Sequence, residues 1–369
     1  MVSPATTLMW RWYNEQRNSN KERRIMSNLA LDHWHIEVSS ICTLQCPRCT
    51  RAEVPETLLN RSLDLKFFQQ QIGQERISQI KKISFCGDDG DPIYAKQFVQ
   101  IVEWIKKINP TIQLLIITNG SYKTETWWKS LADILNEHDE IHWSLDGWDQ
   151  ESNNKYRVNC NWESIISGLT TFVKHNQVTY TVIASIAFRF NELNLKNIHN
   201  LAKTHTMDCW QLTKSTKFGS KYPDAYGSND LLEPLNSNLV ADGHRFERVQ
   251  TILSDKVRPG LDLKELFWNR ALDLNQSNEY PALCYIGNKG VFLKATGEFY
   301  PCCWTALRYP HNKEWNDLAE TKFNMYNNTL DEILQDEWWQ TDFKKFNNLE
   351  CQTKCIKSKL LDKSHVTEW

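Results

Sequence analysis

The sequence predicts an α/β protein built on a parallel β-sheet. Two observations support this class. From residue 33 onward, short apolar runs rich in β-branched and aromatic residues alternate with segments of helical periodicity, and polar or glycine-bearing loops follow the early runs. This alternation favours parallel strands joined by right-handed helical crossovers, in a sheet that is either doubly wound or curved into a barrel. With 369 residues, of which 41% are hydrophobic, the chain can form one large domain or two of ordinary size.

Six strands and five helices are expected in alternation. The strands are expected at 33–40, 81–86, 112–119, 140–146, 179–188 and 208–213. The helices are expected at 63–72, 95–109, 124–136, 162–176 and 195–204. Because the chemistry of parallel α/β folds gathers at the carboxyl ends of the strands, the loops after the first four strands are the expected location of a site.

The alternation ends near residue 218. Residues 218–283 begin with Gly, Pro, Asn and Ser punctuation and continue with helical stretches near 238–254 and 262–274, which indicates a bridging segment.

A small second domain is expected after the bridge. Two apolar runs around "TGE" predict a hairpin within 289–304, and residues 329–346 have the pattern of an amphipathic helix.

Composition limits the partners and the cellular compartment that we expect for the protein. The formal net charge of −2 implies no general attraction to nucleic acid or to an anionic membrane. No run of about 18 apolar residues is present, and the N-terminal stretch lacks the apolar core of a signal peptide, so we expect a cytoplasmic protein. In that setting the 11 cysteines indicate metal ligation or redox chemistry rather than disulfides.

Three of the cysteines, Cys42, Cys46 and Cys49, follow the first expected strand with three and then two residues between them. Three thiolates on a short loop can hold three corners of a [4Fe–4S] cluster. The fourth iron then keeps an open position for a substrate or cofactor. Two alternatives are a structural zinc site, with Cys86 or His35 as fourth ligand, and a ferredoxin-type electron carrier, which needs a fourth cysteine nearby.

This spacing after a first strand, followed by β/α alternation, resembles the signature of the radical S-adenosylmethionine (SAM) superfamily. The resemblance implies a partial (β/α)6 TIM-like barrel over 33–217. It also implies that SAM binds the open iron through its methionine portion. One electron then cleaves SAM to methionine and a 5′-deoxyadenosyl radical, which abstracts hydrogen from a substrate. A flavodoxin-type or ferredoxin-type reductant is the implied electron donor.

The resemblance also implies a set of SAM contacts. "DGDP" (89–92) is similar to the family's Gly-Gly-Glu-Pro segment, although Asp89 and Asp91 depart from it, and a simple Asp-Gly turn is the alternative. Arg157 is similar to an arginine that pairs with the SAM carboxylate, unless it is a surface arginine. The implied SAM-binding residues are Gly90, Asp91, Pro92, Asn119, Ser144, Asp146 and Arg157, with Asn191 and Glu192 as further candidates.

A second group of cysteines resembles the twitch version of the SPASM auxiliary domain, expected over 284–356. The resemblance implies a second, fully ligated [4Fe–4S] cluster that transfers electrons and favours an oxidative outcome. A four-thiolate zinc site is the alternative, and Cys303 competes with its neighbour as the ligand. The implied ligands are Cys284, Cys302, Cys351 and Cys355.

Residues 1–32 and 357–369 lie outside these domains, and residues 1–32 are too short for the leader-binding winged helix of many peptide maturases. This leaves a small molecule, or a peptide recruited through a separate partner, as the expected substrate class. The sequence singles out no catalytic side chain. A radical SAM enzyme acting on RNA is an alternative, as is a non-catalytic metal-binding or electron-transfer protein. We expect neither a membrane nor nucleic acid as the main partner.

Overall fold

A computed structural model describes residues 31–53, 58–220, 229–241, 247–260, 290–307 and 312–342. Within these ranges the chain forms one nine-stranded mixed sheet of order β7-β6-β5-β4-β3-β2-β1-β8-β9, which is open rather than closed. Strands β1 to β6 run parallel, β8 runs parallel to β1, and β7 and β9 pair antiparallel at the two edges. The strands are β1 (His33–Ile36), β2 (Lys82–Phe85), β3 (Gln113–Thr118), β4 (Glu140–Ser144), β5 (Tyr180–Ile186), β6 (Cys209–Lys214), β7 (Glu247–Ile252), β8 (Val291–Leu293) and β9 (Phe299–Tyr300).

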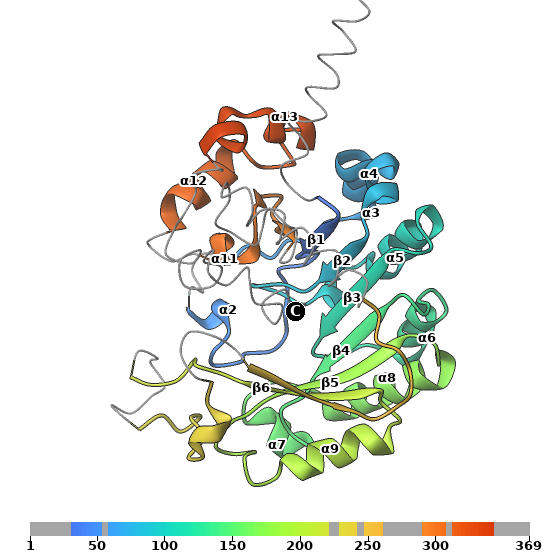
Figure 1. Cartoon of the computed structure of the whole chain (residues 1–369), viewed down its shortest axis with the longest axis vertical. Coiled ribbons are helices and arrows are strands. Elements are labelled where there is room, and N and C mark those ends of the chain that lie inside the picture. The colour runs from blue at the N-terminus through green and yellow to red at the C-terminus, as the bar shows by residue number, and fades with distance from the viewer. Residues whose placement is uncertain are drawn as a thin grey trace, which may run out of the picture.

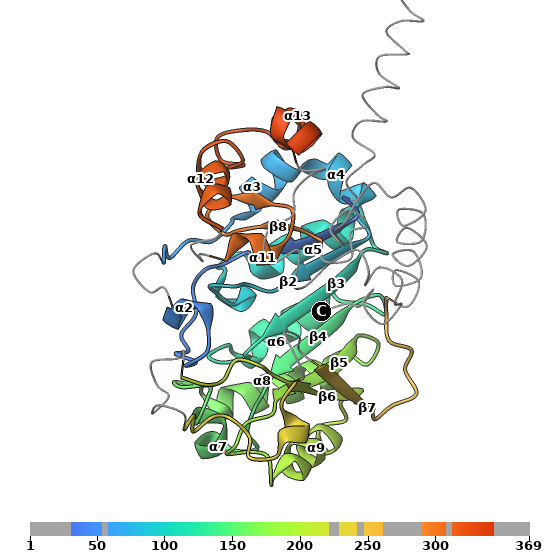
Figure 2. The ribbon, with the colours of Figure 1, turned by 60° about the vertical axis from the view of Figure 1, so that its left-hand side comes forward.

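Helices connect the parallel strands and cover one face of the sheet (Figure 1). The C-terminal helices α11 to α13 gather at the β1 end, whereas α7 and α9 lie at the β5 and β6 end (Figures 1 and 2). The helices are α2 (Thr50–Glu53), α3 (Leu65–Phe67), the π-helix η3 (Phe68–Ile72), α4 (Gly73–Gln79), the 3-10 turn η4 (Pro92–Tyr94), α5 (Phe98–Ile108), α6 (Glu125–Ala132), α7 (Gln150–Asn154), α8 (Trp162–His175), α9 (Leu195–Thr204), the 3-10 turn η5 (Ser237–Leu239), α11 (Cys303–Ala306), α12 (Lys313–Thr321), α13 (Leu330–Gln335) and the π-helix η8 (Trp338–Asp342).

The hydrophobic core lies between the helices and the sheet. Alternate residues of each strand point to this face, so Phe85 of β2 contacts Phe98 of α5 with ring centroids 5.2 Å apart. Trp128 of α6 and Trp143 of β4 meet in the same layer at 5.6 Å. Gly168 of α8 makes room for Trp128, because a Cβ at this glycine would lie 2.1 Å from the indole nitrogen.

The opposite face of the sheet is buried but polar. His35, Ser84 and Glu140 alternate with the core residues on their strands, and each is at most 2% exposed. Glu140 accepts a hydrogen bond from Arg258 Nε at 3.0 Å and also contacts His142. A polar interior on this side suits a ligand-binding face better than a packing face.

Three expected elements differ from the structure. The sequence pattern indicates helix near 238–254, but β7 forms in this stretch because its backbone pairs with β6 from Cys209↔Ile252 to Lys214↔Glu247. The helix expected at 329–346 is interrupted at Asp336, whose ψ of 139° is not helical, so α13 and η8 are separate. The helix expected at 63–72 begins at Leu65 and continues through η3 and α4.

The hairpin expected in the C-terminal part forms as β8 and β9, and β8 extends the main sheet by pairing with β1. The expected helix at 262–274 lies outside the described residues, and the domain boundaries stay a prediction. Among the helices that the structure describes, none is both long enough and apolar enough to cross a membrane.

Candidate functional site

The candidate site lies at the carboxyl ends of β1 to β4, where the loops after these strands meet. The loop after β1 carries the three cysteines and is bonded to its neighbours through the backbone. Asp91 N donates to Ile41 O at 3.1 Å, and Gln45 N donates to Val158 O at 3.0 Å. The cysteine loop therefore lies against the loop after β2 that contains residues 89–92. We call the latter the glycine–aspartate loop.

The three cysteines are free thiols at this edge of the sheet. Cys46 is buried, whereas Cys42 and Cys49 are partly exposed. Burial raises the pKa of Cys42 to about 12 and that of Cys46 to about 11. Metal binding at these sulfurs must therefore release protons.

The donor set fits a [4Fe–4S] cluster, since three soft thiols share one short loop. Within the described ranges, no three His, Cys, Asp or Glu side chains are placed to hold one metal ion together. A cubane does not need that arrangement, because each cysteine binds a different iron at a different corner. SAM would then occupy the iron that has no cysteine.

The glycine–aspartate loop packs directly against the cysteine loop. A Cβ at Gly90 would lie 2.0 Å from Ser39 O and 2.6 Å from Ser40 Cα, so only glycine fits. Arg51 strengthens the same contact by donating to both Ser40 O and Asp89 O. Gly90, one of the SAM-binding residues implied by the resemblance, is thus fixed against the cysteine loop.

The carboxylate of Asp91 accepts hydrogen bonds from other groups of the protein. Its Oδ1 accepts from Thr118 Oγ1 at 2.9 Å and from Ile93 N at 3.2 Å. Its Oδ2 accepts from both Asn119 N and Asn119 Nδ2 at 2.7 Å. Four donors fill the acceptor sites that a carboxylate offers. Burial raises the pKa of Asp91 to about 6, while the hydrogen bonds oppose that rise.

Asp146 and Arg157 form a pair rather than standing apart. Arg157 Nε donates to Asp146 Oδ2 at 2.6 Å, and the carboxylate is fully buried. Ile186 N donates to the other oxygen at 2.6 Å, and Asn191 Nδ2 donates to Asp146 O at 2.9 Å. Ser144 lies at the end of β4, two residues before this pair.

The segment that carries these loops is similar to a known protein family. Residues 36–202 match the model of the Radical SAM superfamily. We call this segment the Radical SAM domain. It contains the cysteine loop, the glycine–aspartate loop and the Asp146–Arg157 pair, and it ends within α9.

Solved structures of Streptococcus suis SuiB share the fold. The structure bound to the precursor peptide SuiA is 15% identical over 98% of this chain and 76% of that chain, with a TM-score of 0.54. The structure bound to S-adenosylmethionine is also 15% identical, over 95% and 76%, with a TM-score of 0.56. At this identity the likeness concerns the fold, an open and mainly parallel partial barrel. A comparison with curated proteins gives no match.

The sequence did not predict a cluster of charged side chains beside the glycine–aspartate loop, which follows β2. Lys294, at the end of β8, lies 3.0 Å from Asp89 Oδ2, and both side chains are at most 8% exposed. Glu37 Oε2 accepts from Asp89 N at 2.7 Å. Burial raises the pKa of Glu37 to about 7 and that of Asp88 to about 8. No sequence pattern links residues 205 positions apart.

A second missed feature lies between two of the cysteines. Arg48 Nη2 is 2.7 Å from Asp230 Oδ2, and each side chain is only 1% exposed. Arg48 Nε also donates to Lys217 O at 3.2 Å. This ion pair ties the cysteine loop of the Radical SAM domain to the segment after β6.

The second cysteine group is only partly described. Cys302 and Cys303 are both buried, and Cys303 packs within the hydrophobic core while Cys302 precedes α11. The other three candidates, Cys284, Cys351 and Cys355, lie outside the described residues. The auxiliary cluster therefore stays a prediction.

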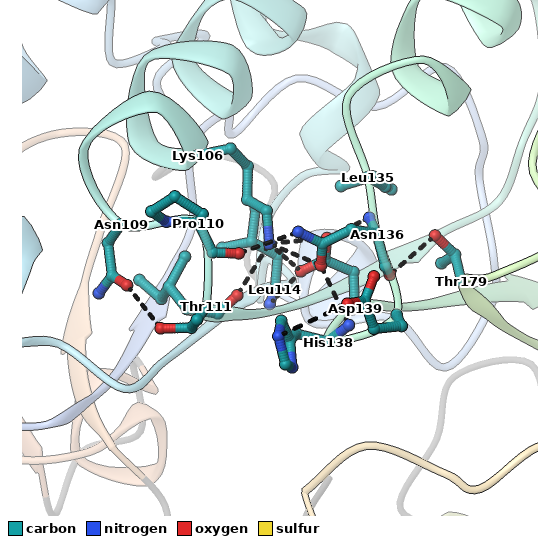
Figure 3. Close-up of polar contacts among 12 residues, drawn as sticks. Lys106, Asn109, Pro110, Thr111, Leu114, Leu135, Asn136, His138, Asp139 and Thr179 are labelled. Atoms are coloured by element: carbon teal, nitrogen blue, oxygen red, sulfur yellow. Dashed lines mark hydrogen bonds and ion pairs between the residues drawn. The ribbon is translucent and has the colours of Figure 1, made fainter.

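A cavity of about 970 Å³ lies at the opposite, amino-terminal edge of the sheet. Its walls include Asn109, Thr111 and His138, which Figure 3 shows around a buried ion pair. In that pair Lys106 Nζ lies 3.0 Å from Asp139. The cavity includes none of the cysteines, and the polar network beside it is bonded within the protein, so we place the chemistry at the carboxyl edge.

Proposed function

We propose that this protein is a radical SAM enzyme that reductively cleaves S-adenosylmethionine and abstracts hydrogen from a peptide or small-molecule substrate. The observation that carries the proposal is the loop after β1. This loop carries three free thiols, with three and then two residues between them, at the carboxyl edge of a parallel sheet and inside a segment that matches the Radical SAM model.

Cys42, Cys46 and Cys49 are the proposed ligands of the [4Fe–4S] cluster. When bound, the cluster supplies an open iron for SAM and the electron that breaks its carbon–sulfur bond. Gly90 and Pro92 set the backbone of the loop that faces this position. The polar, buried face of the sheet supplies the surroundings in which a substrate is held away from water.

A peptide is the first substrate class that we propose. SuiB, which shares the fold, has been crystallised with its precursor peptide SuiA. A small metabolite is the second class, and both fit an enzyme of the maturase or oxidoreductase type. The fold by itself does not select between them.

We further propose an oxidative outcome through a second [4Fe–4S] cluster held by Cys284, Cys302, Cys351 and Cys355. The burial pattern favours Cys302 over Cys303 as the ligand, because Cys303 is part of the hydrophobic core. A cluster with four thiolates has no open iron, so its role is to accept an electron from the substrate radical. A flavodoxin-type or ferredoxin-type protein is the proposed reductant of the first cluster.

The test is an anaerobic SAM-cleavage assay. The protein is reconstituted with iron and sulfide, SAM and dithionite are added, and 5′-deoxyadenosine is quantified. The matched control replaces Cys42, Cys46 and Cys49 with alanine. We expect 5′-deoxyadenosine from the parent protein alone.

Equal yields from the two proteins would overturn the proposal, as would a parent protein that binds no iron. The auxiliary cluster is tested separately by counting iron in the triple-alanine variant. We expect this variant to retain about half of the parent's iron, because its second set of cysteines is intact. Loss of all iron would contradict the second cluster but not SAM cleavage.

A further inference from the structure

Two of the three cysteine sulfurs lie beside a polar side chain of a neighbouring loop. Asn119 Nδ2, at the end of β3, donates to Cys42 Sγ at 3.7 Å. The Arg157 side chain, in the loop after α7, lies beside the sulfur of Cys46, and its positive charge opposes the rise in the pKa of that thiol.

Each of these side chains is held in place by a buried carboxylate. Asn119 Nδ2 also donates to Asp91 Oδ2 at 2.7 Å, so the two hydrogens of its amide have one acceptor each. Arg157 Nε donates to Asp146 Oδ2 at 2.6 Å. The two carboxylates are 6% and 0% exposed, respectively.

A flip of the Asn119 amide would turn its nitrogen away from Cys42 and would also break a hydrogen bond to its oxygen. Its Oδ1 accepts from Ser121 N at 2.9 Å, and this contact fixes which end of the amide faces Cys42. Asp91 in turn is held by four donors. The result is a rigid chain from carboxylate to amide to sulfur.

We propose that Asn119 and Arg157 are positioning residues that set the reduction potential of the cluster, Asn119 through its hydrogen bond to Cys42 and Arg157 through its positive charge beside Cys46. This inference rests on the proposed function, because it requires a [4Fe–4S] cluster on these cysteines. It gives Asp91 and Asp146 the task of orienting the two side chains, in place of the direct SAM contacts implied by resemblance.

The physical reason is the charge on sulfur. Reduction adds an electron to a cluster whose thiolates are already negative, so an N–H donor or a positive charge beside a sulfur stabilises the reduced form more than the oxidised form. Hydrogen bonds to the sulfurs are among the factors that set iron–sulfur potentials. Removal of either group is therefore expected to lower the potential.

The experiment is a potentiometric titration of the reconstituted protein, followed by electron paramagnetic resonance without SAM. Asn119→Asp keeps the oxygen that accepts from Ser121 but replaces the nitrogen that faces Cys42. Arg157→Met removes the positive charge beside Cys46. In each variant we expect iron content equal to that of the parent and a potential lower by at least 59 mV, a tenfold change in the one-electron equilibrium.

Thr118→Val is the matched control. It removes a 2.9 Å hydrogen bond to the same carboxylate, Asp91, but touches no cysteine. Its potential is expected to equal that of the parent. Asn119→Ala and Arg157→Leu are measured as second variants, in case the first ones fold poorly, and should also lower the potential.

Two results would overturn the inference: parental potentials in the Asn119 and Arg157 variants, or an equal fall in Thr118→Val. A parent protein that forms no [4Fe–4S] cluster would instead refute the proposed function. The two failures are therefore distinguishable in one set of samples.

Discussion

Replacement of Gly90 by alanine tests how closely the loop after β2 approaches the cysteine loop. The added Cβ would lie 2.0 Å from Ser39 O and 2.6 Å from two backbone atoms of Ser40. Because all three are backbone atoms, no side-chain rotation relieves the clash. The loop must move by about 1 Å before the contact becomes tolerable, and overpacking of this kind costs about 1–3 kcal/mol.

Movement of this loop is also expected to displace the neighbouring cysteine loop. The loop is held by Asp91 N, which donates to Ile41 O at 3.1 Å in the segment just before Cys42. A misplacement of about 1 Å near reacting groups can lower a rate on the order of 100-fold. We therefore expect Gly90→Ala to fold with reduced stability and to form 5′-deoxyadenosine about 100-fold more slowly than the parent protein.

Urea denaturation and the SAM-cleavage assay measure the two effects. Gly73→Ala is the matched control, because Gly73 has a φ of 78° and a Cβ added there would meet no atom within 4 Å. With a ψ of 158° this residue occupies a region that is essentially restricted to glycine, so alanine there costs about 1–3 kcal/mol in backbone strain alone. It should lose stability but keep its cleavage rate. Parental cleavage by Gly90→Ala would refute the reasoning, and so would an equal loss in Gly73→Ala.

Three further predictions concern stability and the second cysteine group. Lys106→Met should lower the free energy of unfolding by about 3–5 kcal/mol in urea, because it leaves the fully buried Asp139 without its cation; a loss under about 1 kcal/mol would contradict this. Burial lowers the pKa of His35 from 6.5 to about 4, so its contribution is present above pH 6.5 and is lost as the pH falls toward 4. Relative to His35→Gln, the parent should therefore lose about 3 kcal/mol between pH 7 and pH 4, and parallel pH profiles would refute this. Cys302→Ala should lower auxiliary iron while Cys303→Ala leaves it unchanged; the reverse pattern would make Cys303 the ligand.

The local pattern of the sequence was enough to place the parallel strands β1 to β6. The strand expected at 112–119 is β3, Gln113–Thr118, because an apolar run between two helical periods specifies its own conformation. The edge strand β7 escaped the same reasoning. Most of its residues are exposed, so its sequence carries no apolar face, and pairing with β6 decides its structure.

Part of the candidate site could be predicted because short-range sequence patterns also specify it. The three cysteines and Gly90 are specified by short spacings that can be read along the chain. Lys294 beside Asp89 and Asp230 beside Arg48 are not, because their partners lie 205 and 182 positions away. Three of the four hydrogen bonds to Asp91 come from Thr118 and Asn119, and they likewise form only when β2 and β3 lie side by side.

The pairing of β1 with β8 has a consequence for the order of assembly. During synthesis, β1 and the cysteine loop emerge early, but the strand that covers the outer edge of β1 follows more than 250 residues later, with Trp34 opposite Val291. Until then β1 presents an open edge, which invites pairing with other chains. Contacts so distant in sequence also form slowly. The surroundings of the cysteine loop, Lys294 included, are therefore finished only after β8 has been synthesised, so late insertion of the cluster suits this topology.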